Sequence, residues 1–157
     1  MRFHAGWLIG FFLIGCFGCD SNAVYKEITD IEDGAWSVNY TPSYTFTIED
    51  TTATYSLYYN IRNTLSYPYY NLYIRRYLLD ARNRPIDSRL DELILFDRKT
   101  GKPLGDGLGD LFDHKIKVVS GFRFPRRGTY SVRLRQYMRQ NPLPEVLSVG
   151  ISVEKEG

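Results

Sequence analysis

The chain has 157 residues, a formal net charge of +2 and a charged fraction of 24%. A length of this order is typical of one domain with its own hydrophobic core. The near balance of basic and acidic side chains argues against a nucleic-acid-binding protein, which requires a strongly basic surface. Aromatic residues are abundant and include 13 tyrosines, and this composition favours β-strands.

The chain begins with four residues that include a basic side chain, and an apolar run follows over residues 5–18. A basic start and an apolar run of about 14 residues are typical of an export signal, since a membrane-spanning helix needs roughly 20. The run ends at a glycine, and Cys19 follows directly. We interpret residues 1–18 as the signal peptide of a bacterial lipoprotein, in which the cysteine takes up lipid and becomes the first mature residue. An ordinary secretory signal with a chance cysteine is the alternative.

Two cysteines, Cys16 and Cys19, are candidates for lipidation. Cys16 has the better local sequence, because a leucine lies three residues before it and a glycine directly before it. Its apolar segment would end at Gly15, however, which is short for a signal peptide. The residues after Cys19 are polar at once, as a solvated tether requires. We therefore predict lipidation at Cys19, with Cys16 as the alternative, and a domain that is anchored to a membrane through its N-terminal lipid.

Apolar and polar residues alternate with a period of two along much of the mature chain, and this pattern predicts strands. The clearest runs cover residues 44–48, 55–62, 130–135 and 149–154. Turn-forming residues separate the runs. The spacing predicts an all-β fold, an antiparallel β-sandwich of about seven or eight strands over residues 35–157, with residues 19–34 as a lipid-anchored tether.

Within this sandwich, six alternate apolar positions are expected to point inward and be buried: Phe46, Leu57, Ile61, Val132, Leu134 and Ile151. Residues 71–79 carry bulky side chains at both parities, which predicts a central strand that is covered on both sides. A single turn of helix is expected near residues 136–139, before Asn141-Pro142.

Candidate catalytic and metal-binding side chains are few. His114 is the only histidine beyond the signal, and no cysteine follows Cys19, so neither a zinc site nor a cysteine–histidine dyad can form. Residues 105–113 hold three aspartates among glycines, but their spacing does not match that of a helix–loop–helix calcium site. A glycine-rich turn is the expected structure there. We predict no catalytic residue, no metal site, no cofactor and no enzyme activity.

The tyrosines suggest a binding surface. Most are expected to pack across the sheets, where each cross-strand pair contributes roughly 0.2–1 kcal/mol. Tyrosine and arginine are also enriched at protein-binding hot spots. We predict a partner surface made of exposed side chains, namely Tyr58, Arg62, Tyr69 and Tyr70. The same composition suits stacking on sugars, so a carbohydrate-binding surface lipoprotein is the alternative function.

Short motifs along nearly the whole mature chain resemble one family when they are taken together and in order. They include Cys19-Asp20-Ser21-Asn22, Asp50-Thr51-Thr52, Tyr67-Pro68-Tyr69, Gln136-Tyr137-Met138-Arg139 and Pro142-Leu143-Pro144. The chain resembles the gliding motility lipoprotein GldH family of the Bacteroidota. The resemblance implies a non-enzymatic lipoprotein without a cofactor, in the outer membrane or at the periplasmic face. Its implied partners are other envelope proteins of the gliding and type IX secretion machinery. It also supports Cys19 as the lipidated residue.

Overall fold

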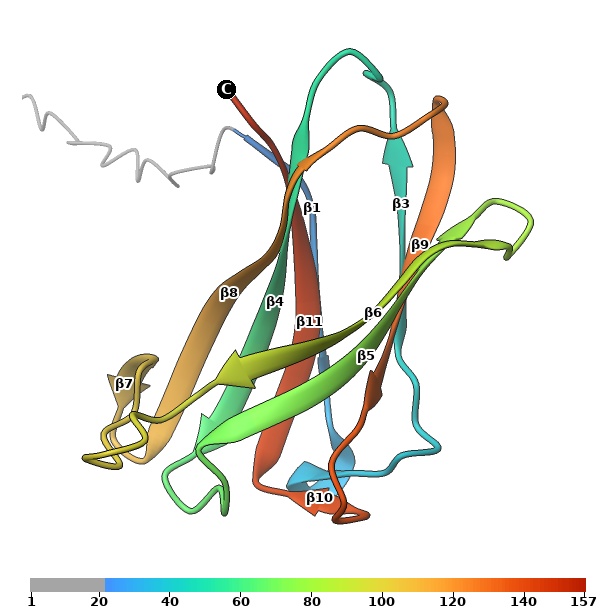
Figure 1. Ribbon diagram of the computed structural model, residues 1–157. Helices are drawn as coiled ribbons and strands as arrows, with labels where there is room; N and C mark the ends of the chain where they lie inside the picture. Colours follow the sequence, from blue (N-terminus) through green and yellow to red (C-terminus); the bar gives the residue numbers. More distant parts are fainter. Residues whose placement is uncertain (1–21) are drawn as a thin grey trace, which may run out of the picture.

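The computed structural model describes residues 22–157, which form a tall β-sandwich (Figure 1). Both candidate lipidation sites, Cys16 and Cys19, lie outside the described residues. The strands in chain order are β1 (Ala23–Asp30), β2 (Ala35–Trp36), β3 (Ser43–Ile48), β4 (Tyr55–Thr64), β5 (Asn71–Asp80), β6 (Pro85–Ile94), β7 (Asp106–Leu108), β8 (Leu111–Phe122), β9 (Gly128–Gln136), β10 (Leu143–Pro144) and β11 (Val146–Lys155).

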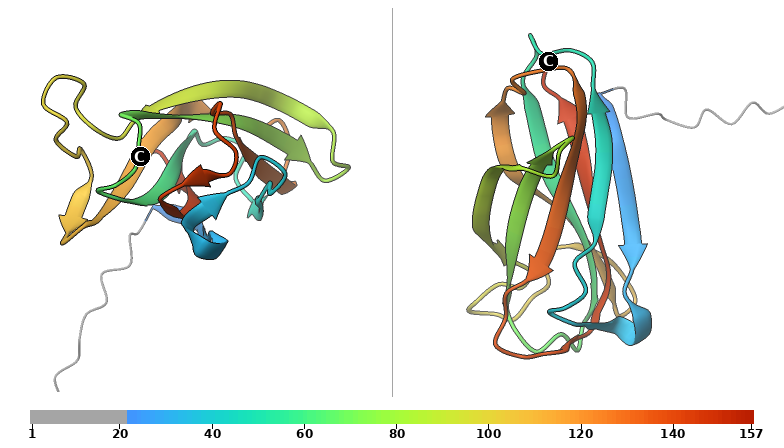
Figure 2. Two further views of the ribbon diagram at one scale, coloured as in Figure 1. Left: turned by 90° about the horizontal axis from the view of Figure 1, so that it is seen from below. Right: turned by 90° about the vertical axis from the view of Figure 1, so that its right-hand side faces the viewer.

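Two antiparallel sheets face each other across the core. The five-stranded sheet has the order β1-β11-β4-β8-β7, and the four-stranded sheet has the order β3-β9-β5-β6. The short strands β2 and β10 pair with each other at the lower end of the molecule. The two layers are clearest when the molecule is turned (Figure 2). Eight of the strands have six residues or more, and the other three have two or three. The predicted all-β antiparallel sandwich is therefore confirmed.

The predicted boundary between the tether and the sandwich is wrong. Residues 23–30, which we expected in the tether, form β1 and pair with β11 from Ala23 opposite Glu154 to Asp30 opposite Ser148. The sequence pattern does not predict this strand, because β1 is an edge strand whose side chains are mostly exposed and its apolar alternation is weak. The next residue, Ile31, is buried, so the folded domain includes residues 23–31.

The predicted turn of helix near residues 136–139 is also wrong. Gln136 is the last residue of β9, and its buried amide organises the bend that follows. Its Nε2 donates to the carbonyl of Gln140 at 3.2 Å, while its Oε1 accepts from the backbone N–H of Met138 at 2.8 Å. Among residues 22–157 the only helix is a single 3-10 turn at Glu32–Gly34.

The core lies between the facing sheets, and all six side chains that we predicted to point inward are buried. Trp36 is fully buried at the lower end, where its indole N–H donates to the carbonyl of Tyr40 at 2.9 Å. At the upper end Phe46, Phe124 and Tyr130 form a group of contacting rings. Each large apolar side chain buried in this way contributes about 1.5–3 kcal/mol.

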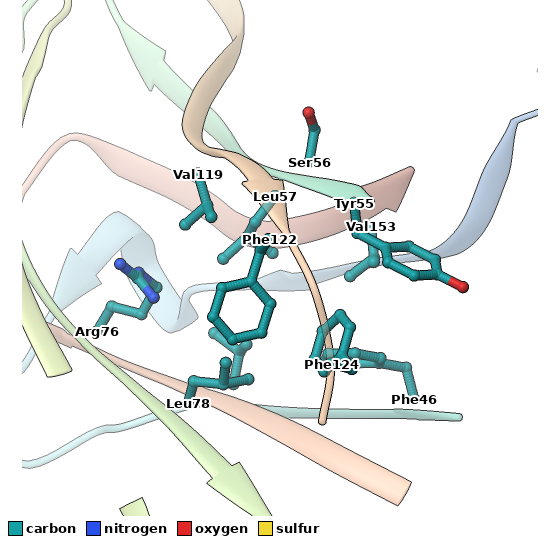
Figure 3. A pocket seen from close by; sticks show the side chains of 11 residues that line it. Phe46, Tyr55, Ser56, Leu57, Arg76, Leu78, Val119, Phe122, Phe124 and Val153 are labelled. Carbon is teal, nitrogen blue, oxygen red and sulfur yellow. The ribbon is translucent and has the colours of Figure 1, made fainter. Parts of the chain in front are cut away.

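One charged side chain lies inside this core. Arg76 on β5 points inward and is 2% exposed. Its Nη1 lies 2.7 Å from Oδ2 of Asp87, and its Nε lies 3.3 Å from Oδ2 of Asp91, both on β6. The hydroxyl of Tyr59 on β4 donates to the same Asp91 oxygen at 2.6 Å. This cluster therefore joins the two sheets through polar contacts, beside an apolar pocket that Leu57, Leu78 and neighbouring rings line (Figure 3).

Strand β5 differs from its prediction on one side. It is central, between β9 and β6, and its inward side chains are buried as expected. Of its outward side chains, Tyr73, Arg75 and Tyr77 are partly exposed, whereas Asn71 and Leu79 near the two ends of the strand are buried. In the described part of the chain no helix or second layer covers the three exposed side chains. Bulky residues on both faces of a strand therefore do not indicate burial on both sides.

Candidate functional site

The four side chains of the predicted partner surface lie in two places. Tyr58 and Arg62 point outward from β4 on the five-stranded sheet. Tyr69 and Tyr70 lie in the loop between β4 and β5. The four residues therefore do not form one continuous patch.

The outward side chains of β4 are already engaged by their neighbours. The ring centroid of Tyr58 lies 4.8 Å from Nζ of Lys115 and 5.3 Å from Nζ of Lys117. Arg62 binds Asp113 through two hydrogen bonds of 2.7 and 2.9 Å, and these bonds lower the pKa of Asp113. Both side chains of this pair are about half exposed, so the pair contributes at most about 1 kcal/mol. A partner that binds Arg62 would have to compete with Asp113.

The two loop tyrosines contact different residues. The hydroxyl of Tyr69 donates to Oε1 of Gln140 at 2.8 Å. The ring of Tyr70 is 37% exposed and lies under the guanidinium of Arg98, with 4.5 Å from the carbon of that group to the ring centroid. Both tyrosines present part of a ring to solvent, as the sequence predicted for exposed positions.

A larger surface of the same chemistry covers the outside of the four-stranded sheet. We call it the basic tyrosine face, and it consists of Tyr73, Arg75, Tyr77, Arg133, Arg135 and Tyr137. The strand register places Tyr77 opposite Arg133 and Arg75 opposite Arg135. The guanidinium carbon of Arg75 lies 5.4 Å from the ring centroid of Tyr137, which is 53% exposed. Planar cations and large rings thus lie side by side on two adjacent strands.

The electrostatic character of this face is positive. The outward positions of β3, β9 and β5 carry no carboxylate. Glu92 on β6 is the nearest acidic side chain in the register, opposite Tyr73, and it is already bound by Asn71 at 2.7 Å and Arg98 at 3.4 Å. The hydrogen bond from Asn71 lowers the pKa of Glu92. Nε of Arg135 is buried and has no hydrogen-bond partner among residues 22–157.

An open groove borders the lower edge of the face. Its lining consists of Tyr69, Tyr73, Leu90, Tyr137, Met138 and Arg139. Of the four predicted surface residues, Tyr69 is the one that lines this groove. Leu90 is 42% exposed, and the groove combines three aromatic rings, a leucine, a methionine and one guanidinium. Such a lining can accept an extended protein segment or the apolar C–H face of a sugar ring.

The other candidates from the sequence lie in a hairpin and on the strand that follows it. Residues 105–113 form the hairpin between β7 and β8, which turns at Gly109 with φ +62°. His114 is 5% exposed, its burial lowers its pKa, and its Nε2 has no hydrogen-bond partner among the described residues. Within residues 22–157 no three histidine, cysteine or acidic side chains are grouped to hold a metal. No helix of the described residues is long and apolar enough to cross a membrane.

Comparison with known proteins identifies relatives over almost the whole domain. The family model of the GldH lipoprotein matches residues 23–153. The "Gliding motility lipoprotein GldH homolog" of Christiangramia forsetii is 28% identical over 144 residues, which cover 87% of this chain and 86% of the relative. The "Gliding motility lipoprotein GldH" of Flavobacterium johnsoniae is 25% identical over 149 residues, or 89% of each chain.

A solved structure, "Crystal structure of infectious bursal disease virus VP2 subviral particle", aligns with 93% of this chain and 36% of the viral chain. At a TM-score of 0.34 and 12% identity this likeness carries no argument about fold or function. The match of the family model begins at the first residue of β1 and ends near the last residue of β11, so it spans both sheets. The chain therefore belongs to the GldH lipoprotein family.

Proposed function

We propose that this lipoprotein is a non-enzymatic accessory component of the gliding and type IX secretion machinery, and that it acts by binding other envelope proteins. The basic tyrosine face carries the proposal, because tyrosine and arginine side chains are over-represented at binding hot spots. Three guanidinium groups without a facing carboxylate favour a partner with an acidic surface. A lipid anchor would confine the domain to one membrane, which raises its effective concentration for partners on that membrane.

Lipidation at Cys19 is the first part of the proposal to test. Cys19→Ala removes the thiol that would receive the lipid, so we expect the protein to remain uncleaved or to leave the membrane fraction. Cys16→Ala serves as the matched control and should be processed and anchored like the parent. Membrane fractionation and mass spectrometry of the N-terminal peptide measure both outcomes. A lipidated N-terminus at Cys16, or an unmodified mature protein, would contradict the assignment.

Binding through the basic tyrosine face is tested by reversing its charge. We expect Arg75→Glu/Arg133→Glu to reduce the recovery of cross-linked envelope partners at least about tenfold. Losing a hot-spot residue typically weakens the binding free energy by about 2 kcal/mol or more. Lys99→Glu/Lys102→Glu makes the same change in charge in the exposed loop between β6 and β7, away from this face, and should leave recovery unchanged. Quantitative mass spectrometry of the tagged, full-length protein gives the readout. Equal recovery from all three proteins would refute a role for the face.

The alternative function is carbohydrate binding, and the groove beside the face is the observation that favours it. The rings of Tyr69, Tyr73 and Tyr137 line this groove and could stack on a sugar. Binding of the parent protein to a glycan array, lost in Tyr137→Ala and unchanged in Arg75→Glu/Arg133→Glu, would favour this function over protein binding.

The surface predicted from the sequence is tested in the same assays with two double variants, Tyr58→Ala/Arg62→Ala and Tyr69→Ala/Tyr70→Ala. We expect the second pair to have the larger effect, because Tyr69 lines the groove.

A further inference from the structure

One end of the sandwich carries the start of the described chain. Ala23 pairs with Glu154 near the end of β11, Lys155 pairs with Tyr55 at the start of β4, and Tyr55 pairs with Phe122 at the end of β8. These residues form one row across the five-stranded sheet. We call this end the anchor end, and it also holds the loops over residues 49–54 and 123–127 (top of Figure 1).

The connection between the proposed lipid and the anchor end is short. Three residues separate Cys19 from Ala23, and an extended chain of this length reaches about 14 Å. The backbone of Asn22 is held to the sheet, because its carbonyl accepts a hydrogen bond of 2.9 Å from the N–H of Lys155. The ten-residue strand β4 alone spans about 33 Å, so a tether of this length cannot bring the opposite end to the membrane while the anchor end points away.

The loop over residues 123–127 presents three arginines at the anchor end. Arg123, Arg126 and Arg127 are exposed, and among residues 22–157 their guanidinium groups have no ion-pair or hydrogen-bond partner. The loop is held in place from below. Phe124 is buried with its ring centroid 4.7 Å from that of Tyr130, and the hydroxyl of Tyr130 donates to the carbonyl of Arg126 at 2.7 Å. The three cations are therefore presented by a fixed backbone.

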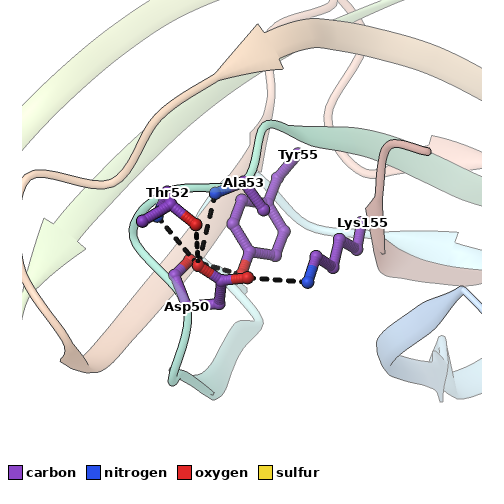
Figure 4. A network of polar contacts seen from close by, with 5 residues as sticks. All are labelled: Asp50, Thr52, Ala53, Tyr55 and Lys155. Carbon is purple, nitrogen blue, oxygen red and sulfur yellow. Dashed lines mark hydrogen bonds and ion pairs between the residues drawn. The ribbon is translucent and has the colours of Figure 1, made fainter.

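Besides Glu154, which accepts from Nζ of Lys115 at 2.5 Å, two carboxylates at the same end are bound by donors on the protein. Asp50 accepts from Lys155 at 2.7 Å and from the backbone and hydroxyl of Thr52 (Figure 4), and these bonds lower its pKa. Glu156 accepts from Ser56 and from the N–H of Gly121, which lowers its pKa to about 2. Both groups stay ionised, but their lone pairs are directed to the protein. Glu49 is the exposed carboxylate at this end without such a partner among the described residues.

We propose that the anchor end rests on the surface of the membrane that holds the lipid, and that Arg123, Arg126 and Arg127 bind the phosphates of anionic phospholipid headgroups. The inference rests on the proposed lipidation near residue 19. Guanidinium groups suit this ligand because their planar donors match phosphate oxygens in pairs. The strands then stand away from the membrane, and the basic tyrosine face points sideways, toward proteins on the same surface.

Fluorescence quenching on the intact lipoprotein tests the orientation. If Cys19 is lipidated, the mature protein has no free thiol, so a single added cysteine takes up one label. Thr51→Cys places the label in the 49–54 loop, and Leu65→Cys places it at the opposite end, where Leu65 is 50% exposed. In vesicles that contain lipids with a spin label on the headgroup, we expect quenching of the Thr51 label to exceed that of the Leu65 label at least about threefold.

The role of the arginines is tested in the Thr51→Cys background. Adding phosphatidylglycerol to phosphatidylcholine vesicles should raise quenching about twofold, and high salt should reverse the increase. Arg126→Gln/Arg127→Gln should abolish the increase, whereas the matched control Lys99→Gln/Lys102→Gln should retain it. Equal quenching of the two labels, or an increase that survives in Arg126→Gln/Arg127→Gln, would overturn the inference. Protein that does not float with the vesicles would contradict the lipid anchor as well. Binding to envelope partners is measured in a separate assay, so its outcome is distinguishable from this one.

Discussion

Arg76→Ala is expected to lower the free energy of unfolding by about 3–5 kcal/mol, because removing one partner of a buried ion pair leaves the other without compensation. The guanidinium is 2% exposed and binds both Asp87 and Asp91 between the sheets. Without it, Asp91 retains the hydrogen bond from Tyr59 but loses its positive neighbour. Urea denaturation followed by circular dichroism measures the change.

A matched control for this prediction lies one residue earlier on the same strand. Arg75→Ala removes the same kind of side chain from the outward side of β5, so its cost should stay below about 1 kcal/mol. Arg76→Met/Asp91→Leu should recover part of the loss, since apolar replacements of a buried pair are often nearly neutral. A cost for Arg76→Ala as small as that for Arg75→Ala would mean that the cluster does not stabilise the sandwich.

Gly150→Ala is expected to destabilise the protein by about 3 kcal/mol, at the upper end of the usual cost of overpacking. A Cβ atom at this position would lie 2.3 Å from the carbonyl oxygen of Glu27 and 2.7 Å from Cα of Ile28. Both are backbone atoms of β1, so the strand would have to move away from β11. Faster amide hydrogen exchange over residues 23–30 should accompany the loss of stability.

Ser148→Ala is the matched control for Gly150→Ala. It tests whether any substitution on this part of β11 destabilises the protein. Ser148 lies two residues earlier on β11, opposite Asp30 of the same edge strand, and a smaller side chain there meets no backbone atom. Its cost should stay below about 1 kcal/mol. Unchanged exchange over residues 23–30 in Gly150→Ala would refute close packing of β1 against the glycine.

Strands were predictable from the sequence where one face of the strand is buried and the other is exposed to solvent. Tyr44 and Phe46 on β3 illustrate this, since each is buried and alternates with exposed polar neighbours. The same rule misses β1, because an edge strand with both faces largely exposed has little apolar alternation. It is also ambiguous on β5, where Arg75 and Arg76 are adjacent and chemically identical. Which of the two is buried depends on Asp87 and Asp91, and these residues reach it only through the pairing of β5 with β6.

The candidate site was predictable in its chemistry but not in its location. Tyr70 is exposed, as expected from its place beside a proline and a turn, whereas the partner surface to which it was assigned stays a prediction. The grouping of tyrosine and arginine on the basic tyrosine face follows from strand order, because Arg75 meets Arg135 only when β5 and β9 become neighbours. No local pattern in one sequence specifies that neighbourhood. Lipidation at Cys19 stays a prediction, as it lies outside residues 22–157.

The position of β1 also determines how the domain would respond to mechanical tension. A pull from the lipid enters at Ala23 and runs along the axis of β1, whose hydrogen bonds to β11 lie perpendicular to that axis. The force therefore shears all the bonds of the β1–β11 ladder together instead of opening them one after another. A domain held between a moving partner and its membrane would resist such a load through this single strand pair.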